Sequence, residues 1–174
     1  VDYISDRFMT TGFINYNLGS VDTLVSGDDY AQTSTIGGFA VNLRGGYRYG
    51  KTKGSVITTD LIYSTGDANG INDNHYSGVM TGNNWGAPVS VWISHGAYIL
   101  FPHGNVVNRF IGAINDISNL GYGTAGGTLN LYKDLIDNKL NVKVGGAAAL
   151  SNVAPAGGGN LVGIEANGRI SWTP

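Results

Sequence analysis

The sequence predicts an all-β protein, built as an antiparallel up-and-down transmembrane β-barrel or as part of one. Six segments alternate apolar with small or polar residues at a period of two, so each has one apolar and one hydrated face. These segments run for roughly 12–16 residues, whereas strands of soluble proteins usually have about 5–6 and membrane strands about 9–11. Only 13% of the residues are charged, against about 25% in ordinary soluble proteins.

Length and composition exclude several classes of protein. With 174 residues, the chain is expected to form a single barrel domain over residues 1–174, or a fragment of a barrel. The net charge of −2 and the isoelectric point near 5.8 give no basic surface for nucleic acid. Absence of cysteine excludes disulfides and thiolate metal sites. No run of 18 apolar residues is present, so we expect no transmembrane helix.

The first three strands are predicted before residue 67. In the second, Phe39, Val41 and Leu43 alternate with small or polar residues. The polar stretch Ser20–Ser34 before it is rich in turn formers and is expected to be a loop, and Lys51–Lys53 forms a tight turn. The three strands are predicted at residues 7–19, 36–50 and 54–66.

The middle of the chain, Asp67–Asn119, is predicted to be one long extracellular or lumen-folded segment. It opens with turn-forming residues. Further on, apolar residues recur at helical spacing, which predicts a short helix over Val106–Ser118. Three more strands follow, at residues 120–135, 139–152 and 160–173, and Asp137 and Asn138 form the turn between the first two of these.

The strand register expected around the two short turns places the apolar residues of paired strands on the same face of the sheet. Pairing across both turns keeps apolar residues together, and around Lys51–Lys53 it also sets a carboxylate opposite a guanidinium. Both short turns fall at one end and the long connections at the other, as in outer-membrane barrels. The expected pairs are Tyr47 with Ile57, Arg44 with Asp60, Leu135 with Leu140, and Leu131 with Val144.

Two sets of residues are candidates for function in such a barrel. Four positive and two negative charges lie on the polar strand faces, where they would line a lumen and attract anionic solutes; the structural alternative is ion pairing such as Arg44 with Asp60. Aromatic residues near the strand ends would form interfacial girdles. The lumen set is Arg44, Arg48, Asp60, Lys143, Glu165 and Arg169, and the girdle set is Tyr16, Tyr49, Tyr63 and Trp172.

A calcium site is a further candidate. Asp67, Asn69 and Asp73 place hard oxygen ligands in one turn-rich stretch, as Ca²⁺ prefers. Their spacing does not match an EF-hand loop, and an ordinary solvated loop is the alternative. No other cofactor is indicated. The sequence contains no HExxH or GxSxG motif, so we expect the protein not to be an enzyme.

The stretch Leu61–Gly70, which contains Tyr-Ser-Thr-Gly-Asp, resembles the turn through which strands leave the membrane in Gram-negative outer-membrane porins. Tyr76–Gly86 adds to this resemblance, which is closest to the alginate-export-type barrels. It implies a location in the bacterial outer membrane, with the lipid bilayer and lipopolysaccharide as partners. It also implies a porin-like channel for passive diffusion of small polar or anionic solutes through a charged lumen.

Two features depart from a complete barrel of this kind. Bacterial barrels have at least about eight strands, whereas six are predicted here. The sequence ends at Trp172–Pro174 and lacks the terminal aromatic residue typical of complete barrels. We therefore expect further strands of a larger barrel, or other subunits, as partners. The alternative function is a structural or adhesive β-sheet module of a secreted or surface assembly.

Overall fold

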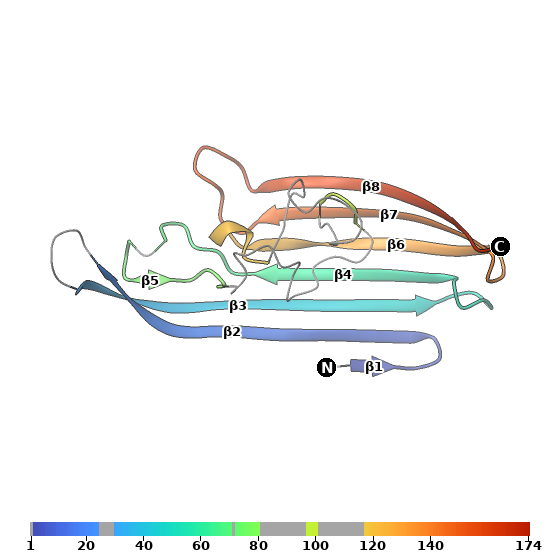
Figure 1. The fold of residues 1–174 in the computed structure, drawn as a ribbon, viewed down its shortest axis with the longest axis horizontal. Helices are drawn as coiled ribbons and strands as arrows, with labels where there is room; N and C mark the ends of the chain where they lie inside the picture. Colours follow the sequence, from blue (N-terminus) through green and yellow to red (C-terminus); the bar gives the residue numbers. More distant parts are fainter. Residues whose placement is uncertain (1, 25–29, 71, 81–96, 101–116) are drawn as a thin grey trace.

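The computed structural model describes residues 2–24, 30–70, 72–80, 97–100 and 117–174, which form one eight-stranded sheet (Figure 1). Seven strands pair antiparallel in the order β1-β2-β3-β4-β6-β7-β8, and β5, which lies between β4 and β6 in the sequence, pairs parallel with β3. Within these residues the sheet is not closed, since β1 and β8 lie at its two edges. Its strands are β1 (Asp2–Ile4), β2 (Phe8–Leu24), β3 (Tyr30–Arg48), β4 (Val56–Ser64), β5 (His75–Tyr76), β6 (Thr124–Ile136), β7 (Leu140–Ser151) and β8 (Leu161–Trp172).

The all-β, up-and-down antiparallel fold predicted from the sequence is confirmed, and an open sheet of this kind is consistent with a partial barrel. The six predicted strands are β2, β3, β4, β6, β7 and β8. The loop predicted at Ser20–Ser34 is wrong in part, because β2 continues to Leu24 and β3 starts at Tyr30. Polar residues pair across this hairpin, as where Thr33 Oγ1 donates to Asp22 at 2.8 Å.

Two short strands were not predicted. Strand β1 adds three residues to the edge of β2, and β5 adds His75 and Tyr76 beside Thr35 and Ile36. Most of the helix predicted at Val106–Ser118 lies outside the described residues; its last two residues form a turn that leads into a 3₁₀ helix, η1 (Asn119–Gly121).

The predicted strand register is confirmed at three of its four pairs. Arg44 lies opposite Asp60, Tyr47 opposite Ile57, and Leu131 opposite Val144. The fourth is wrong, because an irregularity between Asp134 and Ile136 brings Ile136, not Leu135, opposite Leu140. An extra residue in one strand leaves two residues facing one on the partner.

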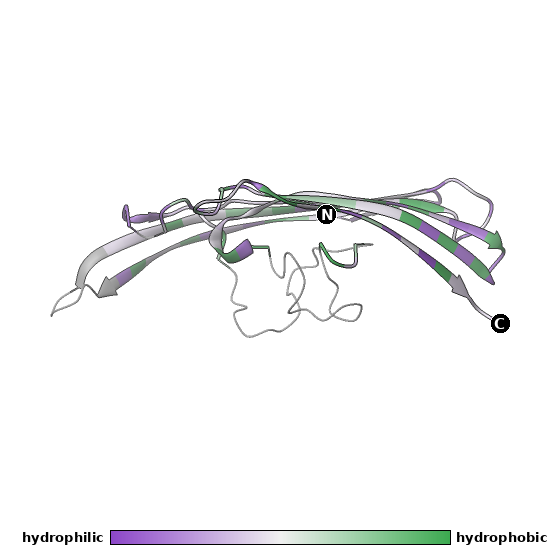
Figure 2. Cartoon of the chain, turned by 90° about the horizontal axis from the view of Figure 1, so that it is seen from above, coloured by the Kyte–Doolittle hydropathy of each residue, from purple (hydrophilic) through white to green (hydrophobic). Residues whose placement is uncertain are grey.

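The sheet is a shallow arch, and the Ala97–Leu100 segment and η1 lie within its hollow (Figure 2). We call this side the concave face; it carries the side chains of Asn42, Asp60, Lys143 and Glu165, which contact each other or the crossing segments. The other side is the convex face. The small apolar core lies under the concave face, where Ala40, Ile62 and Ala149 of the sheet meet Val79, Leu100 and Ile117.

Candidate functional site

Polar side chains cross the concave face in rows set by the strand register. One row runs from β1 to β8 through residues that lie directly opposite one another in neighbouring strands. Because the side-chain period is two and all pairs are in step, these residues share one face. The row consists of Asp2, Thr11, Arg44, Asp60, Thr128, Ala147 and Glu165.

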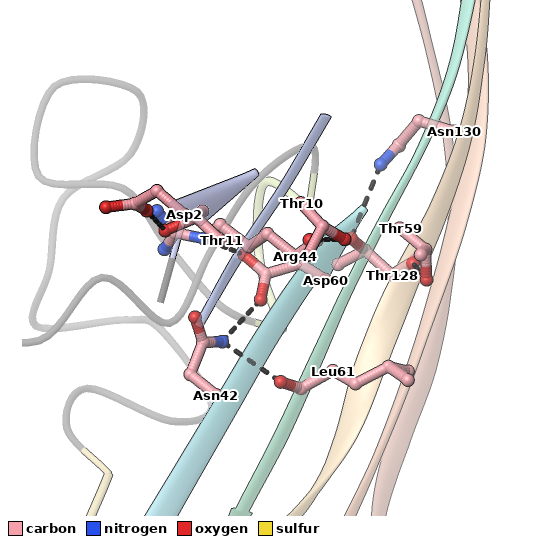
Figure 3. A network of polar contacts seen from close by, with 10 residues as sticks. All are labelled: Asp2, Thr10, Thr11, Asn42, Arg44, Thr59, Asp60, Leu61, Thr128 and Asn130. Atoms are coloured by element: carbon pink, nitrogen blue, oxygen red, sulfur yellow. Dashed lines mark hydrogen bonds and ion pairs between the residues drawn. The ribbon is translucent and has the colours of Figure 1, made fainter. Parts of the chain in front are cut away.

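The centre of the row is an ion pair between the partly exposed Arg44 and the buried Asp60, with an amide partner (Figure 3). Arg44 Nε lies 2.8 Å from Asp60 Oδ2, and Asn42 Nδ2 donates to Asp60 Oδ1 at 2.6 Å. The same amide nitrogen is 3.0 Å from the Leu61 carbonyl oxygen. Asp60 is only 2% exposed, so its negative charge depends on these donors rather than on water.

The Glu165 carboxylate anchors a distant segment of backbone to β8. Its two oxygens accept hydrogen bonds from the backbone N–H groups of Tyr98, Ile99 and Leu100 at 2.7, 2.9 and 2.7 Å. Asn167 Nδ2 donates to the same carboxylate at 2.7 Å. Charge-assisted hydrogen bonds of this kind are among the strong ones, so Glu165 holds Ala97–Leu100 against the concave face.

Lys143 lies beside this anchor and is 1% exposed. Its ammonium donates to Asn167 Oδ1 at 2.6 Å and lies 4.4 Å from the centre of the Tyr98 ring, which is within cation–π range. Arg169 is opposite Lys143 in the ladder and exposed. The concave face therefore concentrates positive charge on β7 and β8, at the row next to the short turns.

All six residues predicted for the lumen lie on the concave face, but they differ in role. Asp60 and Lys143 are buried, Arg44, Arg48 and Glu165 are partly exposed, and Arg169 is exposed. Arg44 forms an ion pair with Asp60. Glu165 and Lys143 are linked through Asn167, which hydrogen-bonds to both side chains. Arg48 stands apart, with its guanidinium 3.4 Å from the Asp6 carbonyl oxygen.

The four predicted girdle residues are exposed on the convex face. Tyr63 lies opposite Val41, and Tyr49 directly follows the end of β3, eight residues after Val41. About 27 Å along the strand direction therefore separates the two tyrosines. At a tilt of about 40°, this corresponds to about 20 Å along a barrel axis, close to the roughly 25 Å apolar band of membrane barrels. Tyr16 lies beyond Tyr63 at one end, and Trp172 lies beyond Tyr49 at the other.

The acidic residues predicted for calcium organise the loop after β4. Asp67 accepts hydrogen bonds from the Ser77 N–H at 2.7 Å, the Ser77 hydroxyl at 2.9 Å and the Asn69 N–H at 3.0 Å. Burial alone would raise the pKa of Asp67, but the hydrogen bonds from Ser77 and Asn69 outweigh it and lower the pKa below 3.8. Asp73 accepts the His75 N–H at 3.1 Å.

Within the described ranges, no three His, Cys, Asp or Glu side chains gather closely enough to hold a metal ion. The calcium site at Asp67, Asn69 and Asp73 stays a prediction. In the same ranges, no helix has the length and apolar character needed to cross a membrane.

Sequence reasoning missed three contributors to the site. Asn42 and Asn167 each bridge a carboxylate to a second group, and Tyr98 supplies both a backbone donor and a ring. The sequence does contain a signal for the two asparagines, because each lies on the polar face of its strand, two residues from a charged residue. The contact with Tyr98 has no local signal, since 67 residues separate it from Glu165.

Comparison with known proteins gave no match to a family model, to a curated protein or to a solved structure.

We expect Arg44→Gln to lower the free energy of unfolding by about 3–5 kcal/mol, because it leaves the buried Asp60 carboxylate without its cation. Adding Asp60→Asn to Arg44→Gln should restore part of this stability. The double variant should therefore lose less free energy of unfolding than the two single variants lose in total. Urea titration of all three variants measures the coupling. Arg48→Gln is the matched control on the same strand and face, with an expected change within about 0.5 kcal/mol. Additive losses would contradict the ion pair.

The lowered pKa of Asp67 predicts a pH dependence of stability with a defined sign. The folded protein binds this proton less tightly than the unfolded chain, so the stabilisation is present above pH 3.8 and is lost as pH falls through the lower folded pKa. Asp67→Asn should cost about 1.5–3 kcal/mol at pH 7 and flatten this acid dependence. Unfolding at pH 7 and pH 3 measures both, with Asp73→Asn as the exposed control. An equal effect of the two variants would refute the assignment.

Proposed function

We propose that this chain forms part of the wall of a bacterial outer-membrane β-barrel that acts as a porin-like channel for small polar or anionic solutes. The observation that carries the proposal is the inverted polarity of the sheet. Its convex face exposes large apolar side chains, including Ile14 at 75% and Ile164 at 79%, whereas its concave face buries Asp60 and Lys143. A soluble antiparallel sheet normally packs its apolar face inward and hydrates the polar one.

Lipid is the medium that suits this polarity. Each square ångström of apolar surface removed from water contributes about 25 cal/mol, so a whole apolar sheet face favours a hydrocarbon environment strongly. The aromatic residues near both ends of this face are where headgroup-level girdles occur in membrane barrels. This supports the lipid bilayer, with lipopolysaccharide in its outer leaflet, as the partner of the convex face.

The open edges of the sheet require partners in that setting. Among the strands that the structure describes, β1 and β8 each have a neighbour on one side only. In the hydrocarbon core, backbone groups that lack hydrogen bonds cost several kcal/mol each, so spanning sheets close into barrels. We infer that further strands of a larger barrel, or other subunits, complete the wall beyond β1 and β8.

The concave face supports passage of polar solutes with a preference for anions. Two of its carboxylates, those of Asp60 and Glu165, are engaged by Arg44 and Asn42, and by the Ala97–Leu100 backbone, respectively. Arg48 and Arg169, at opposite sides of the same row, are at least partly open to water. Cations that line a water-filled passage raise the local concentration of anions.

Cysteine scanning tests the membrane wall directly, because the sequence has no native cysteine. Ile14 and Asn15 are adjacent on β2, both exposed, and point to opposite faces. In vesicles, we expect bimane on Ile14→Cys to be quenched by lipids with brominated acyl chains, and bimane on Asn15→Cys to be quenched by aqueous iodide. Equal quenching at both sites, or a monodisperse chain in detergent-free buffer, would instead support a structural or adhesive sheet module.

The Glu165 anchor predicts a second measurable effect. Glu165→Gln removes the charge that holds three backbone amides, so hydrogen exchange at Tyr98, Ile99 and Leu100 should accelerate about tenfold or more. Because the segment crosses the concave face, channel conductance in planar bilayers should rise. Arg169→Gln, a charge change on the same strand and face, is the control, and should alter ion selectivity without altering exchange at these amides. Unchanged exchange in Glu165→Gln would refute the anchor.

A further inference from the structure

The convex face contains an apolar groove of about 530 Å³ that runs from β1 to β6. Except for Met9 and Gly46, its lining residues have convex-face positions in the strand alternation. The volume lies within the range of about 300–1,000 Å³ of small-molecule sites. The walls of the groove come from large side chains that are at least partly exposed, those of Tyr3, Phe8, Tyr47, Ile57 and Leu129.

The groove exists because the row of residues that forms its floor is small. Thr10, Gly45 and Thr59 lie directly opposite one another in β2, β3 and β4. The Thr10 hydroxyl donates to the Arg44 carbonyl oxygen at 3.1 Å, and the Thr59 hydroxyl to that of Thr128 at 3.0 Å. The Thr59 methyl group lies beside Gly45, where a Cβ would be 3.3 Å from it. Since both hydroxyls have backbone partners, the floor is as apolar as the walls.

A lysine lies beyond the groove, toward the short turns. Lys133 is exposed on the convex face of β6, four residues after Leu129, so about 14 Å of strand separates the two. Its ammonium is 5.5 Å from the centre of the Tyr49 ring, within cation–π range. The ring is held in place because the Tyr49 hydroxyl donates to the Tyr132 carbonyl oxygen at 2.9 Å. At a strand tilt of about 40°, Lys133 lies about 10 Å from the groove along a barrel axis, which suits a lipid headgroup with its acyl chain below.

Charge is distributed unequally between the two ends of the sheet. The short turns lie together at one end (Figure 1). Residues 49–55 and 132–140, around these turns, contain two aspartates and four exposed lysines, Lys51, Lys53, Lys133 and Lys139. The described residues of the connections at the other end include no lysine or arginine, but they include Asp22, Asp67 and Asp73. Basic residues at a membrane surface attract anionic lipids, so the short-turn end is the one that suits a lipid phosphate.

We propose that this part of the convex face binds an anionic phospholipid, with its phosphate on Lys133 beside Tyr49 and one acyl chain in the groove. Lysine binds phosphate as a point charge, and the apolar groove suits hydrocarbon. Free phosphate would meet only Lys133, whereas a phospholipid engages both features. Short turns lie on the periplasmic side of outer-membrane barrels, which places the site in the leaflet opposite the lipopolysaccharide. The inference rests on the proposed function, which places the convex face in a bilayer, and it names the lipid class that one region of this face prefers.

Lipid quenching in vesicles tests this site. Leu131 is exposed between the groove and Lys133, so bimane on Leu131→Cys reports the lipid that occupies this region, and bimane on Ile14→Cys reports the same face away from it. Brominated phosphatidylglycerol or phosphatidylcholine with the same acyl chains is added to unbrominated phosphatidylcholine vesicles.

At Leu131→Cys, phosphatidylglycerol should reach half-maximal quenching at a mole fraction about fivefold lower than phosphatidylcholine, because one lysine near anionic lipid accounts for about that factor. At Ile14→Cys, the two lipids should quench alike. Equal quenching by the two lipids at Leu131→Cys would overturn the proposal.

Matched variants in the Leu131→Cys chain test the two halves of the site. Lys133→Gln should remove the preference for phosphatidylglycerol, whereas Lys139→Gln, in the turn that follows, should change it less than about twofold. Gly45→Val fills the groove and should weaken phosphatidylglycerol severalfold. Gly146→Val is its control, because Gly146 lies in the same row of the convex face outside the groove, and a Cβ there would also meet its nearest atom at 3.3 Å. Equal effects within either pair would overturn the site.

The outcomes separate this inference from the proposed function. Lipid quenching at Ile14→Cys without a preference for phosphatidylglycerol at Leu131→Cys refutes the lipid site and leaves the membrane wall standing. Quenching at Ile14→Cys with none at Leu131→Cys means that another strand or subunit covers the groove, which also refutes the site. Absence of quenching at both positions refutes the membrane wall, and with it the lipid site that depends on it.

Discussion

The side chains of a β-strand alternate between two faces, and the backbone ladder keeps neighbouring strands in step, so one register error would reverse a whole strand. Every feature of this sheet depends on that constraint. It places Arg44 opposite Asp60 and collects the charges on one face while Ile14, Leu43 and Leu61 collect on the other. The buried ion pair in turn penalises any slip of β3 against β4, because a slip would leave the Asp60 carboxylate buried without its cation.

Much of this arrangement could be predicted from the sequence because its causes are local. Alternation and short turns were sufficient to predict six strands, the pairing of Arg44 with Asp60 and the shared face of the charged residues. The prediction failed where the cause is not local. The pairing ends of β2 and β3 near Leu24 and Tyr30 are rich in polar residues, so their sequence looked like a loop. Strand β5 forms by pairing with Thr35 and Ile36, which are distant in the sequence. The role of Glu165 depends on backbone donors 65 to 67 residues away in sequence, which no pattern near Glu165 reveals.

The two faces pose opposite energetic problems. On the convex face, apolar side chains are costly in water and need lipid or another apolar surface. On the concave face, buried polar groups need partners, and the structure provides them from within the chain. Asp60 is satisfied by neighbours in adjacent strands, whereas Glu165 recruits the Ala97–Leu100 backbone from another part of the chain. The concave face therefore both stabilises the sheet and holds a segment across it.

A passage for solutes requires fixed charges that do not bind the solute too tightly. The Asp60 and Glu165 carboxylates on the concave face are already engaged by partners within the chain, so they belong to the wall and are not ligand-binding groups. What remains accessible are groups at the edges of the rows, such as Arg169 at β8 and Asp2 at β1. Because these groups are partly hydrated, each is worth little as a single contact, and only a solute that engages two at once gains appreciable affinity. The spacing of such groups, set by the strand register, thus determines which solutes the face can distinguish.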